Sequence, residues 1–272
     1  MKRTRLAITT VATLAVCAFA AGPAAAAPTW APADSAPIHP GVMTHTDGAQ
    51  CTANFVYYDA SNVYIGQAAH CSGTGSATST DGCSSQSLPE GTPVEVDGAS
   101  KPGTMVYNSW IRMQANGETD PDTCAYNDLA LVKLDPADAA KVNPSIPFWG
   151  GPQGIDTDGT QLKDEVESYG NSSLRGGTTQ LSPKDGYSLG DDGNGWSHIV
   201  YTATPGIPGD SGSAFLNDQG QALGVLSTVA IAPVTGSNGV GDINKELNYA
   251  NGHGVAVTLA AGTEQFTGGL LP

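Results

Sequence analysis

Three short segments of this 272-residue sequence carry side chains that could act together as a hydrolytic site. A hydroxyl nucleophile is weak unless an imidazole takes its proton, and the imidazole needs a carboxylate to orient it and to stabilise its charged form. Ser211, His70 and Asp128 supply these three groups. Each segment alone is also compatible with an ordinary turn or strand end. The combination predicts nucleophilic catalysis. The segments are residues 67–71 (QAAHC), 127–132 (NDLALV) and 208–213 (PGDSGS).

The glycines around the candidate nucleophile fit the same chemistry. Gly209 and Gly212 flank Asp210 and Ser211, and they allow the tight backbone turn that a pair of oxyanion-binding N–H groups requires. The chain order is His, Asp, Ser, whereas α/β-hydrolases place the serine first, within G-x-S-x-G. Ser213 stands where that motif has its last glycine. The order therefore argues against an α/β-hydrolase.

The elements that must position these residues are predicted to be short strands. Apolar runs rich in β-branched and aromatic residues recur between clusters of Gly, Pro, Asn and Asp, which favours an all-β barrel or sandwich. One helix is predicted over residues 243–250, with Asp242 as its N-cap and with Ile243, Leu247 and Ala250 on one face. The runs are residues 55–58, 63–65, 93–96, 129–132, 198–201, 222–226 and 254–257.

The composition narrows the class of protein. The chain contains 35 Gly and 18 Pro, and only 14% of its residues are charged, which excludes a coiled coil and a charge-rich disordered protein. Acidic residues number 26 against 11 basic ones, a net charge of −15. We expect no nucleic-acid partner, because this charge repels phosphate.

The first 26 residues have the pattern of a secretory signal peptide. A positive start is followed by an apolar run over residues 6–21 and by three alanines, which predicts cleavage after Ala26 and a secreted, extracellular protein. A lipid anchor at Cys17 is the alternative, although Val16 is bulky for a lipidation box. No other stretch reaches the length of a membrane span, so no membrane partner is expected.

The remaining chain is predicted to form two halves after a short leader. Residues 27–40 are rich in Pro and Ala and are interpreted as a leader or short pro-segment. A second Pro-rich and Ala-rich stretch, residues 135–152, is interpreted as a crossing between halves of similar size. The predicted domains are thus residues 41–145 and residues 146–272.

Four cysteines remain once the signal peptide is removed, and in an exported chain they predict two disulfides. The sequence alone allows three pairings. A zinc site is the alternative, but the cysteines lack C-x-x-C spacing, and the other histidines lack ligand spacing and are interpreted as surface or loop residues. No metal or cofactor is predicted, with calcium beside glycine-flanked aspartates left as an alternative. The residues concerned are Cys51, Cys71, Cys83 and Cys124; His39, His45, His198 and His253; and Asp156, Asp158, Asp191 and Asp192.

Taken together, these motifs resemble those of the secreted bacterial chymotrypsin-like (trypsin-like) serine peptidases. The resemblance spans roughly residues 41–259 and is carried by Cys51 with residues 68–71, by residues 127–131, by residues 209–212 and by residues 224–227. It implies two packed six-stranded antiparallel β-barrels with a catalytic cleft between them, the first barrel supplying His70 and Asp128 and the second supplying Ser211. It also implies a Cys51–Cys71 disulfide, which leaves Cys83 to pair with Cys124.

The same resemblance implies a serine-type endopeptidase that needs no cofactor. Ser211 would attack the peptide carbonyl, His70 would shuttle the proton and Asp128 would orient His70, while the N–H groups of Gly209 and Ser211 would hold the oxyanion. The substrate would be a polypeptide and the protein a monomer. A catalytically inactive relative that binds a partner and a secreted esterase remain alternatives.

The sequence also departs from the family pattern. The Ile-Val-Gly-Gly start that supplies a counter-charge to the equivalent of Asp210 in animal relatives is missing. Another cation must then neutralise Asp210, because an unpaired buried carboxylate is costly. Arg112, Arg175 and Lys184 are the candidates.

Specificity is the last expectation drawn from the resemblance. The pocket for the residue before the scissile bond would be walled by residues 205–208, by Ser227, Thr228 and Val229, and by a strand that starts at Gly254. These walls carry no charge, which disfavours Arg and Lys and predicts small or medium apolar residues. Preference for glutamate through His253 is the alternative, and the excursion over residues 230–252 is expected to overhang the pocket.

Overall fold

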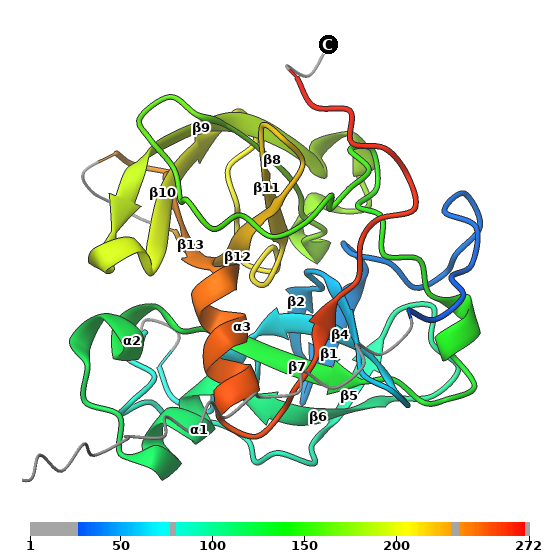
Figure 1. Ribbon diagram of the computed structural model, residues 1–272, viewed down its shortest axis with the longest axis horizontal. Helices are drawn as coiled ribbons and strands as arrows, with labels where there is room; N and C mark the ends of the chain where they lie inside the picture. The colour runs from blue at the N-terminus through cyan, green and yellow to red at the C-terminus, as the bar shows by residue number, and fades with distance from the viewer. Residues whose placement is uncertain (1–26, 77–79, 230–233, 270–272) are drawn as a thin grey trace, which may run out of the picture.

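Two antiparallel β-sheets, one above the other in Figure 1, form most of the protein. The structure is a computed structural model that describes residues 27–76, 80–229 and 234–269. The predicted signal peptide, residues 1–26, lies outside the described residues, as do residues 230–233 of the predicted excursion.

The lower sheet in Figure 1 has eight strands in the order β14-β3-β4-β7-β6-β5-β1-β2. It consists of β1 (Met43–Thr46), β2 (Ala49–Thr52), β3 (Val56–Tyr58), β4 (Val63–Ala68), β5 (Pro93–Val96), β6 (Gly103–Asn108), β7 (Leu129–Lys133) and β14 (Thr258–Leu259). The upper sheet is a closed barrel of six strands in the order β10-β13-β12-β11-β8-β9. It consists of β8 (Glu165–Tyr169), β9 (Pro183–Asp192), β10 (Ser197–Thr202), β11 (Ala214–Asn217), β12 (Ala222–Val229) and β13 (Asn238–Asp242).

The predicted all-β fold class is confirmed, and the second half forms the predicted six-stranded barrel. The first half differs, because it is an open sheet of eight strands with β2 at one edge and β14 at the other. Its extra edge strand comes from the far end of the chain: Thr258 pairs with Tyr58, and Leu259 pairs with Tyr57. Residues 258–259 thus join the first sheet, although they lie within the predicted second domain.

Six of the seven predicted apolar runs lie in strands or overlap them, whereas the prediction of a strand over residues 254–257 is wrong. The backbone N–H groups there serve the end of the preceding helix instead of a strand ladder. Val255 N donates to the Ala250 carbonyl, and Val257 N donates to Asn251 Oδ1 at 2.9 Å. The strand begins only at Thr258.

The predicted helix is confirmed as α3 (Ile243–Gly252), and the Asp242 carboxylate accepts the Lys245 N–H at 2.7 Å as its cap. Two helices were not predicted, α1 (Ser109–Asn116) and α2 (Pro121–Tyr126). Both have side-chain caps, from Asn108 and Asp120 respectively. Short 3-10 segments complete the structure: η1 (Ala69–Ser72), η2 (Ala139–Lys141), η3 (Ser173–Arg175), η4 (Thr179–Leu181) and η5 (Gly193–Gly195).

The two sheets share one apolar cluster, which fixes their relative position. Tyr57 and Leu131 of the first sheet and Leu216 of the barrel belong to it, together with Trp149 from the connection between the sheets. The apolar face of α3 joins the same cluster, and Figure 1 shows this orange helix between β12 above and α1 below. Burial of these side chains is the main favourable contribution to such a junction.

His198 on β10 corrects the prediction of a surface or loop histidine, because its side chain is fully buried. Its two ring nitrogens contact Asp191 Oδ1 at 2.7 Å and Asp242 Oδ2 at 3.1 Å. Burial lowers the pKa of His198, but the two carboxylates outweigh burial and raise it above its usual value. The histidine therefore ties β9 and β10 to the cap of α3.

Across the described parts of the chain, the helices are too short and too polar to cross a membrane.

Candidate active site

A cleft of about 590 Å³ receives residues from both sheets and contains the three predicted catalytic residues. His70 lies in η1, two residues after β4 ends, and Asp128 directly precedes β7. Because β4 and β7 are paired neighbours, with Ala68 opposite Leu129, the sheet brings these two side chains together. Ser211 reaches the cleft from the loop before β11.

The contact between His70 and Asp128 has the geometry of an oriented base. The Nδ1 atom of His70 lies 2.7 Å from Asp128 Oδ2, and the His70 main-chain N–H donates to Asp128 Oδ1 at 2.9 Å. The Ser227 hydroxyl donates to Asp128 Oδ2 at 2.5 Å. The Asp128 side chain is only 5% exposed, while that of His70 is 28% exposed. The Asp128 carboxylate is thus held by three hydrogen bonds, and the His70 imidazole remains partly exposed in the cleft.

The electrostatic balance at His70 favours its protonated form. Burial lowers the pKa of His70, but the charge of Asp128 and the hydrogen bond to it raise the pKa above the usual value of 6.5. A base that gains stability on protonation is suited to take a proton from a hydroxyl group.

The loop around Ser211 adopts the tight turn expected from its glycines. Gly209 has φ +95° and Gly212 has φ +89°, both in the left-handed region that favours glycine. A Cβ atom at Gly212 would lie 2.5 Å from the Thr52 carbonyl oxygen. The loop is anchored to both sheets, because Thr52 N donates to the Ser211 carbonyl at 2.8 Å and Gly212 N donates to the Leu226 carbonyl at 2.7 Å.

Two cations neutralise Asp210, which is fully buried. Arg175 Nη2 lies 2.5 Å from Asp210 Oδ2, and Lys184 Nζ lies 3.0 Å from the same oxygen. Burial lowers the pKa of Lys184, and Asp210 opposes that shift. The third candidate, Arg112, pairs with Glu90 instead, at 2.7 Å. The carboxylate next to Ser211 therefore has its counter-charges within the described chain.

The cleft is lined by some of the residues predicted to wall the specificity pocket. Ser227, Thr228 and Val229 line the cleft, as do Ile207 and Pro208.

The predicted third wall, a strand starting at Gly254, is not there. The neighbours of β12 are β11 and β13, and Thr228 pairs with Gly239 of β13. Gly254 instead follows α3, where a Cβ atom would lie 2.9 Å from the Arg112 guanidinium. His253 stacks on Tyr249 with ring centroids 3.9 Å apart. Neither residue lines the cleft, and neither does α3, so the expected overhang is not supported by the helix.

Sequence reasoning missed Asn238, which braces this pocket from β13. Its amide donates to the Thr228 carbonyl at 3.1 Å, and its oxygen accepts the Gly206 N–H at 2.8 Å. Asn238 is fully buried and thus fixes the spacing of the two uncharged walls. Its role depends on the pairing of β12 with β13, for which the sequence offered no local signal.

A second missed residue is Glu246 on α3. It is fully buried, and its Oε1 atom accepts the main-chain N–H of Asp128 at 2.8 Å.

The two disulfides are those implied by the family resemblance. Cys51 is joined to Cys71, next to His70, and Cys83 is joined to Cys124.

The described residues include two groups of three potential metal ligands, and each group contains both cysteines of one disulfide. Asp156 and Asp191, two of the aspartates considered for calcium, accept hydrogen bonds from neighbouring N–H groups.

We predict that Cys51→Ser lowers both stability and activity, because the lost disulfide closes a loop that ends beside His70. The chain-entropy estimate for a loop of this length is about 3 kcal/mol of unfolding free energy. Urea denaturation and turnover of one substrate should be measured together. Cys83→Ser is the matched control, because Cys51 and Cys71 line the cleft whereas Cys83 and Cys124 do not. It should lower stability with a smaller loss of turnover. Equal turnover losses in both variants would contradict the prediction.

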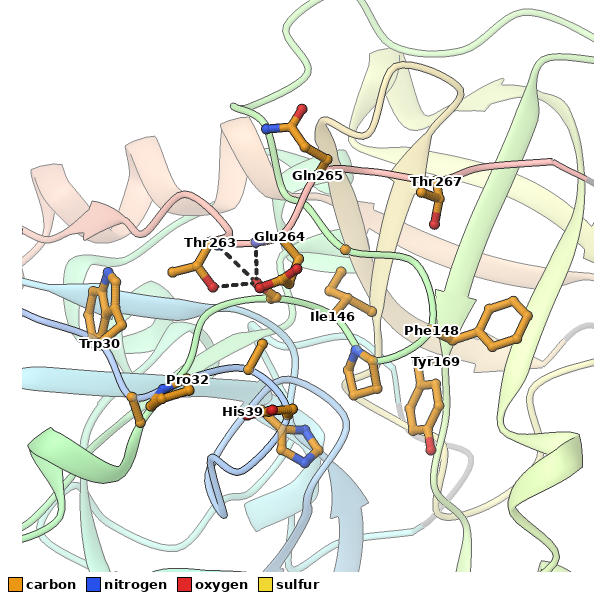
Figure 2. Close-up of a pocket in the computed structure, with 16 residues that line it drawn as sticks. Trp30, Pro32, His39, Ile146, Phe148, Tyr169, Thr263, Glu264, Gln265 and Thr267 are labelled. Atoms are coloured by element: carbon orange, nitrogen blue, oxygen red, sulfur yellow. Dashed lines mark hydrogen bonds between the residues drawn. The ribbon is translucent and has the colours of Figure 1, made fainter.

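A larger cavity, about 950 Å³, lies elsewhere and lacks the triad. Figure 2 shows it between the N-terminal segment with Trp30, the connection with Phe148 and the C-terminal segment with Thr263 and Glu264. Its one serine, Ser145, accepts the N–H groups of Thr263 and Glu264 at 2.9 and 3.0 Å. The candidate active site is therefore the smaller cleft.

Comparison with known proteins supports the fold and not a sequence family. No family model matches the chain, and no curated protein matches it by sequence. Thermobifida fusca Protease A is 18% identical at a TM-score of 0.53, covering 83% of this chain and 99% of that one. A glutamic acid specific serine protease that uses a histidine triad in substrate binding is 19% identical at a TM-score of 0.51, covering 82% and 100%. A Glu endopeptidase in complex with MPD is 18% identical at 0.51, covering 81% and 92%. The chain thus has the fold of the chymotrypsin-like serine proteases.

Proposed function

We propose that this protein is a secreted serine endopeptidase in which Ser211 is the nucleophile, His70 the general base and Asp128 the residue that orients His70. The observation that carries the proposal is the His70–Asp128 pair at 2.7 Å in the same cleft as Ser211. The signal-peptide pattern and the two disulfides support secretion. The fold adds support, because its solved neighbours are serine proteases.

The proposed reaction has two halves. Ser211 Oγ attacks the peptide carbonyl carbon while its proton moves to His70 Nε2, and the oxyanion accepts hydrogen bonds from the N–H groups of Gly209 and Ser211. The tetrahedral adduct then expels the amine, which takes the proton from His70 and leaves an acyl-enzyme. Water attacks that ester with His70 again as base, which releases the carboxylic acid and restores Ser211.

A fluorophosphonate probe tests the proposal directly. The active enzyme should be labelled at Ser211, as located by peptide mapping, and should cleave casein. A protein that is labelled but cleaves only nitrophenyl esters would instead be an esterase. A folded protein that is not labelled would support the alternative of an inactive binding protein.

The proposed role of His70 predicts how activity depends on pH. His70 must be neutral to accept the Ser211 proton, and its pKa is raised above 6.5 by Asp128. The rate should therefore rise with pH, with its midpoint above 6.5. In Asp128→Asn the midpoint should fall, because the raising charge is gone. Profiles of kcat/KM from pH 5 to 9 decide the matter, and a flat profile in the native protein would exclude His70 as the base.

For specificity we propose cleavage after small or medium apolar residues. The walls at Ile207, Thr228 and Val229 carry no charge. Two cations also contact the segment just before Ile207. Lys184 Nζ donates to the Thr204 carbonyl at 3.1 Å, and Arg175 Nη2 donates to the Pro205 carbonyl at 3.2 Å. A Lys or Arg side chain of the substrate would meet positive charge without a partner.

Profiling with a peptide library checks this prediction. We expect the main products to end in Ala, Val or Leu. Glutamate is the second candidate, because Arg175 and Lys184 together carry one positive charge more than Asp210 balances. A route through His253 has no support, because His253 directly follows α3, stacks on Tyr249 and does not line the cleft. Dominant cleavage after Arg or Lys would contradict the assignment of the pocket.

A further inference from the structure

The mechanism above leaves Glu246 unused, although it is one of the most completely buried acidic groups of the described chain. Its side chain has no solvent exposure, and it extends from α3 towards the start of β7. Its Oε1 atom accepts the main-chain N–H of Asp128 at 2.8 Å, while its Oε2 atom is buried without a hydrogen-bond partner. A buried carboxyl group in which one oxygen has no hydrogen-bond partner is unusual, so its presence requires a physical explanation.

Acidic groups influence the pKa of Glu246. Asp128 and Asp242 raise its pKa through their charges, and the buried tyrosines Tyr57 and Tyr107 interact with it electrostatically. Burial is the largest cause and raises the pKa of Glu246 well above 4.5, whereas the hydrogen bond from Asp128 lowers it. The uncharged acid is therefore the form that this site favours.

The fold also reserves space for this carboxyl group. Gly241 on β13 faces it, and a Cβ atom there would lie 2.4 Å from Glu246 Oε1 and 3.0 Å from the Tyr126 carbonyl oxygen. Gly241 does not have a positive φ, so its backbone alone does not require glycine. The close approach of Glu246 and the main chain of α2 accounts for glycine at this position.

We propose that Glu246 is a positioning residue for Asp128: an uncharged carboxylic acid on α3 that accepts the Asp128 N–H and thereby holds the Asp128–His70 pair in place beside Ser211. The side chain of Asp128 is already held by His70 and Ser227. Its main-chain carbonyl accepts the Ala69 N–H at 2.7 Å, so the Asp128 N–H is the group that Glu246 holds. The inference rests on the proposed function, because only a working triad makes that position matter.

Three variants separate this role from general stabilisation. Glu246→Gln keeps a neutral acceptor and should react with a fluorophosphonate at close to the native rate. Glu246→Leu removes the acceptor and should react about 10- to 100-fold more slowly, the scale expected for a displaced catalytic group. Leu247→Ala, a buried neighbour on the same helix, should lower the unfolding temperature without slowing the reaction.

Two further measurements do not depend on activity. The Asp128 amide should exchange its hydrogen much faster in Glu246→Leu than in the native protein or in Glu246→Gln. The infrared difference spectrum of native protein against Glu246→Gln at neutral pH should contain the C=O stretch of a protonated carboxyl group. If Glu246→Leu does not fold, Gly241→Ala provides the second variant, because its new methyl group displaces the Glu246 carboxyl.

Several results would overturn the proposal. Equal slowing in Glu246→Gln and Glu246→Leu, or carboxylate bands in the difference spectrum, would show that the charged form acts there. Native reactivity in Glu246→Leu, or equal slowing in Leu247→Ala, would remove the positioning role. If the native protein itself is not labelled, the proposed function fails, while unchanged Asp128 exchange in Glu246→Leu would separately refute the contact.

Discussion

Ser211→Ala is expected to lower kcat by about 10⁶-fold, the loss seen when a Ser-His-Asp enzyme loses its nucleophile. The serine oxygen forms the covalent bond of the acyl-enzyme, and no neighbouring group can replace it. The change removes one atom at a partly exposed position, so the thermal unfolding midpoint should stay close to the native value. Turnover of a peptide substrate and the unfolding midpoint are the two measurements.

Ser61→Ala is a suitable control, because Ser61 lies in an exposed turn between β3 and β4. It should retain full turnover and full labelling by the fluorophosphonate. Native turnover in Ser211→Ala would end the proposed mechanism, whereas loss of turnover together with unfolding would leave Ser211 as a structural residue only.

The second large effect is expected at Asp210. Asp210→Asn leaves Arg175 and Lys184 buried without an anion, and breaking a buried ion pair in this way costs about 3–5 kcal/mol of unfolding free energy. Activity should fall as well, because Asp210 holds the loop that carries Ser211: its Oδ2 atom accepts the Ile207 N–H at 3.1 Å. Urea denaturation with parallel activity measurements checks both effects.

The double variant Asp210→Asn with Lys184→Met makes this prediction sharper. Removing one of the two unpaired cations should recover part of the lost stability. The effects of the two substitutions on the free energy of unfolding should therefore not be additive. Asp135→Asn is the control, because its ion pair with Lys101 at 3.1 Å lies at the surface and should contribute little. A single variant Asp210→Asn as stable as the native protein would contradict the charge balance described here.

The candidate triad could be predicted because its signals are local. His70 and Asp128 stand at the ends of apolar runs that form paired strands, and the glycines beside Ser211 fit a single turn. The helix α3 was predicted for the same reason, since both its cap and its apolar face lie within one short segment.

The other features of the candidate site depend on contacts between segments that are far apart in the sequence. Asn238 and Glu246 serve the site only through the pairing of β13 with β12 and the packing of α3. Position in the fold also decides which arginine neutralises Asp210. Arg175 does so, because Arg112 pairs with Glu90. The prediction of a strand beginning at Gly254 is wrong because α3 extends past the predicted end at residue 250, and its last residues accept the N–H groups of Val255 and Val257.

Signals for the two missed helices were nevertheless present. Asn108 caps α1 through the N–H groups of Trp110 and Ile111, and Gly117 ends that helix in the left-handed conformation. Asp120 followed by Pro121 is a typical start for α2. Both helices are short, and an apolar period is hard to recognise within two turns.

The return of the C-terminal segment to the first sheet links the chemistry to the order of synthesis. A nascent chain that has emerged as far as Asp242 already contains His70, Asp128 and Ser211. It still lacks the acceptor for the Asp128 N–H and the strand that covers the β3 edge. The first sheet, although made first, is completed only by residues 258–259. A chain synthesised only as far as Asp242 therefore lacks two of the contacts that complete the surroundings of the candidate site.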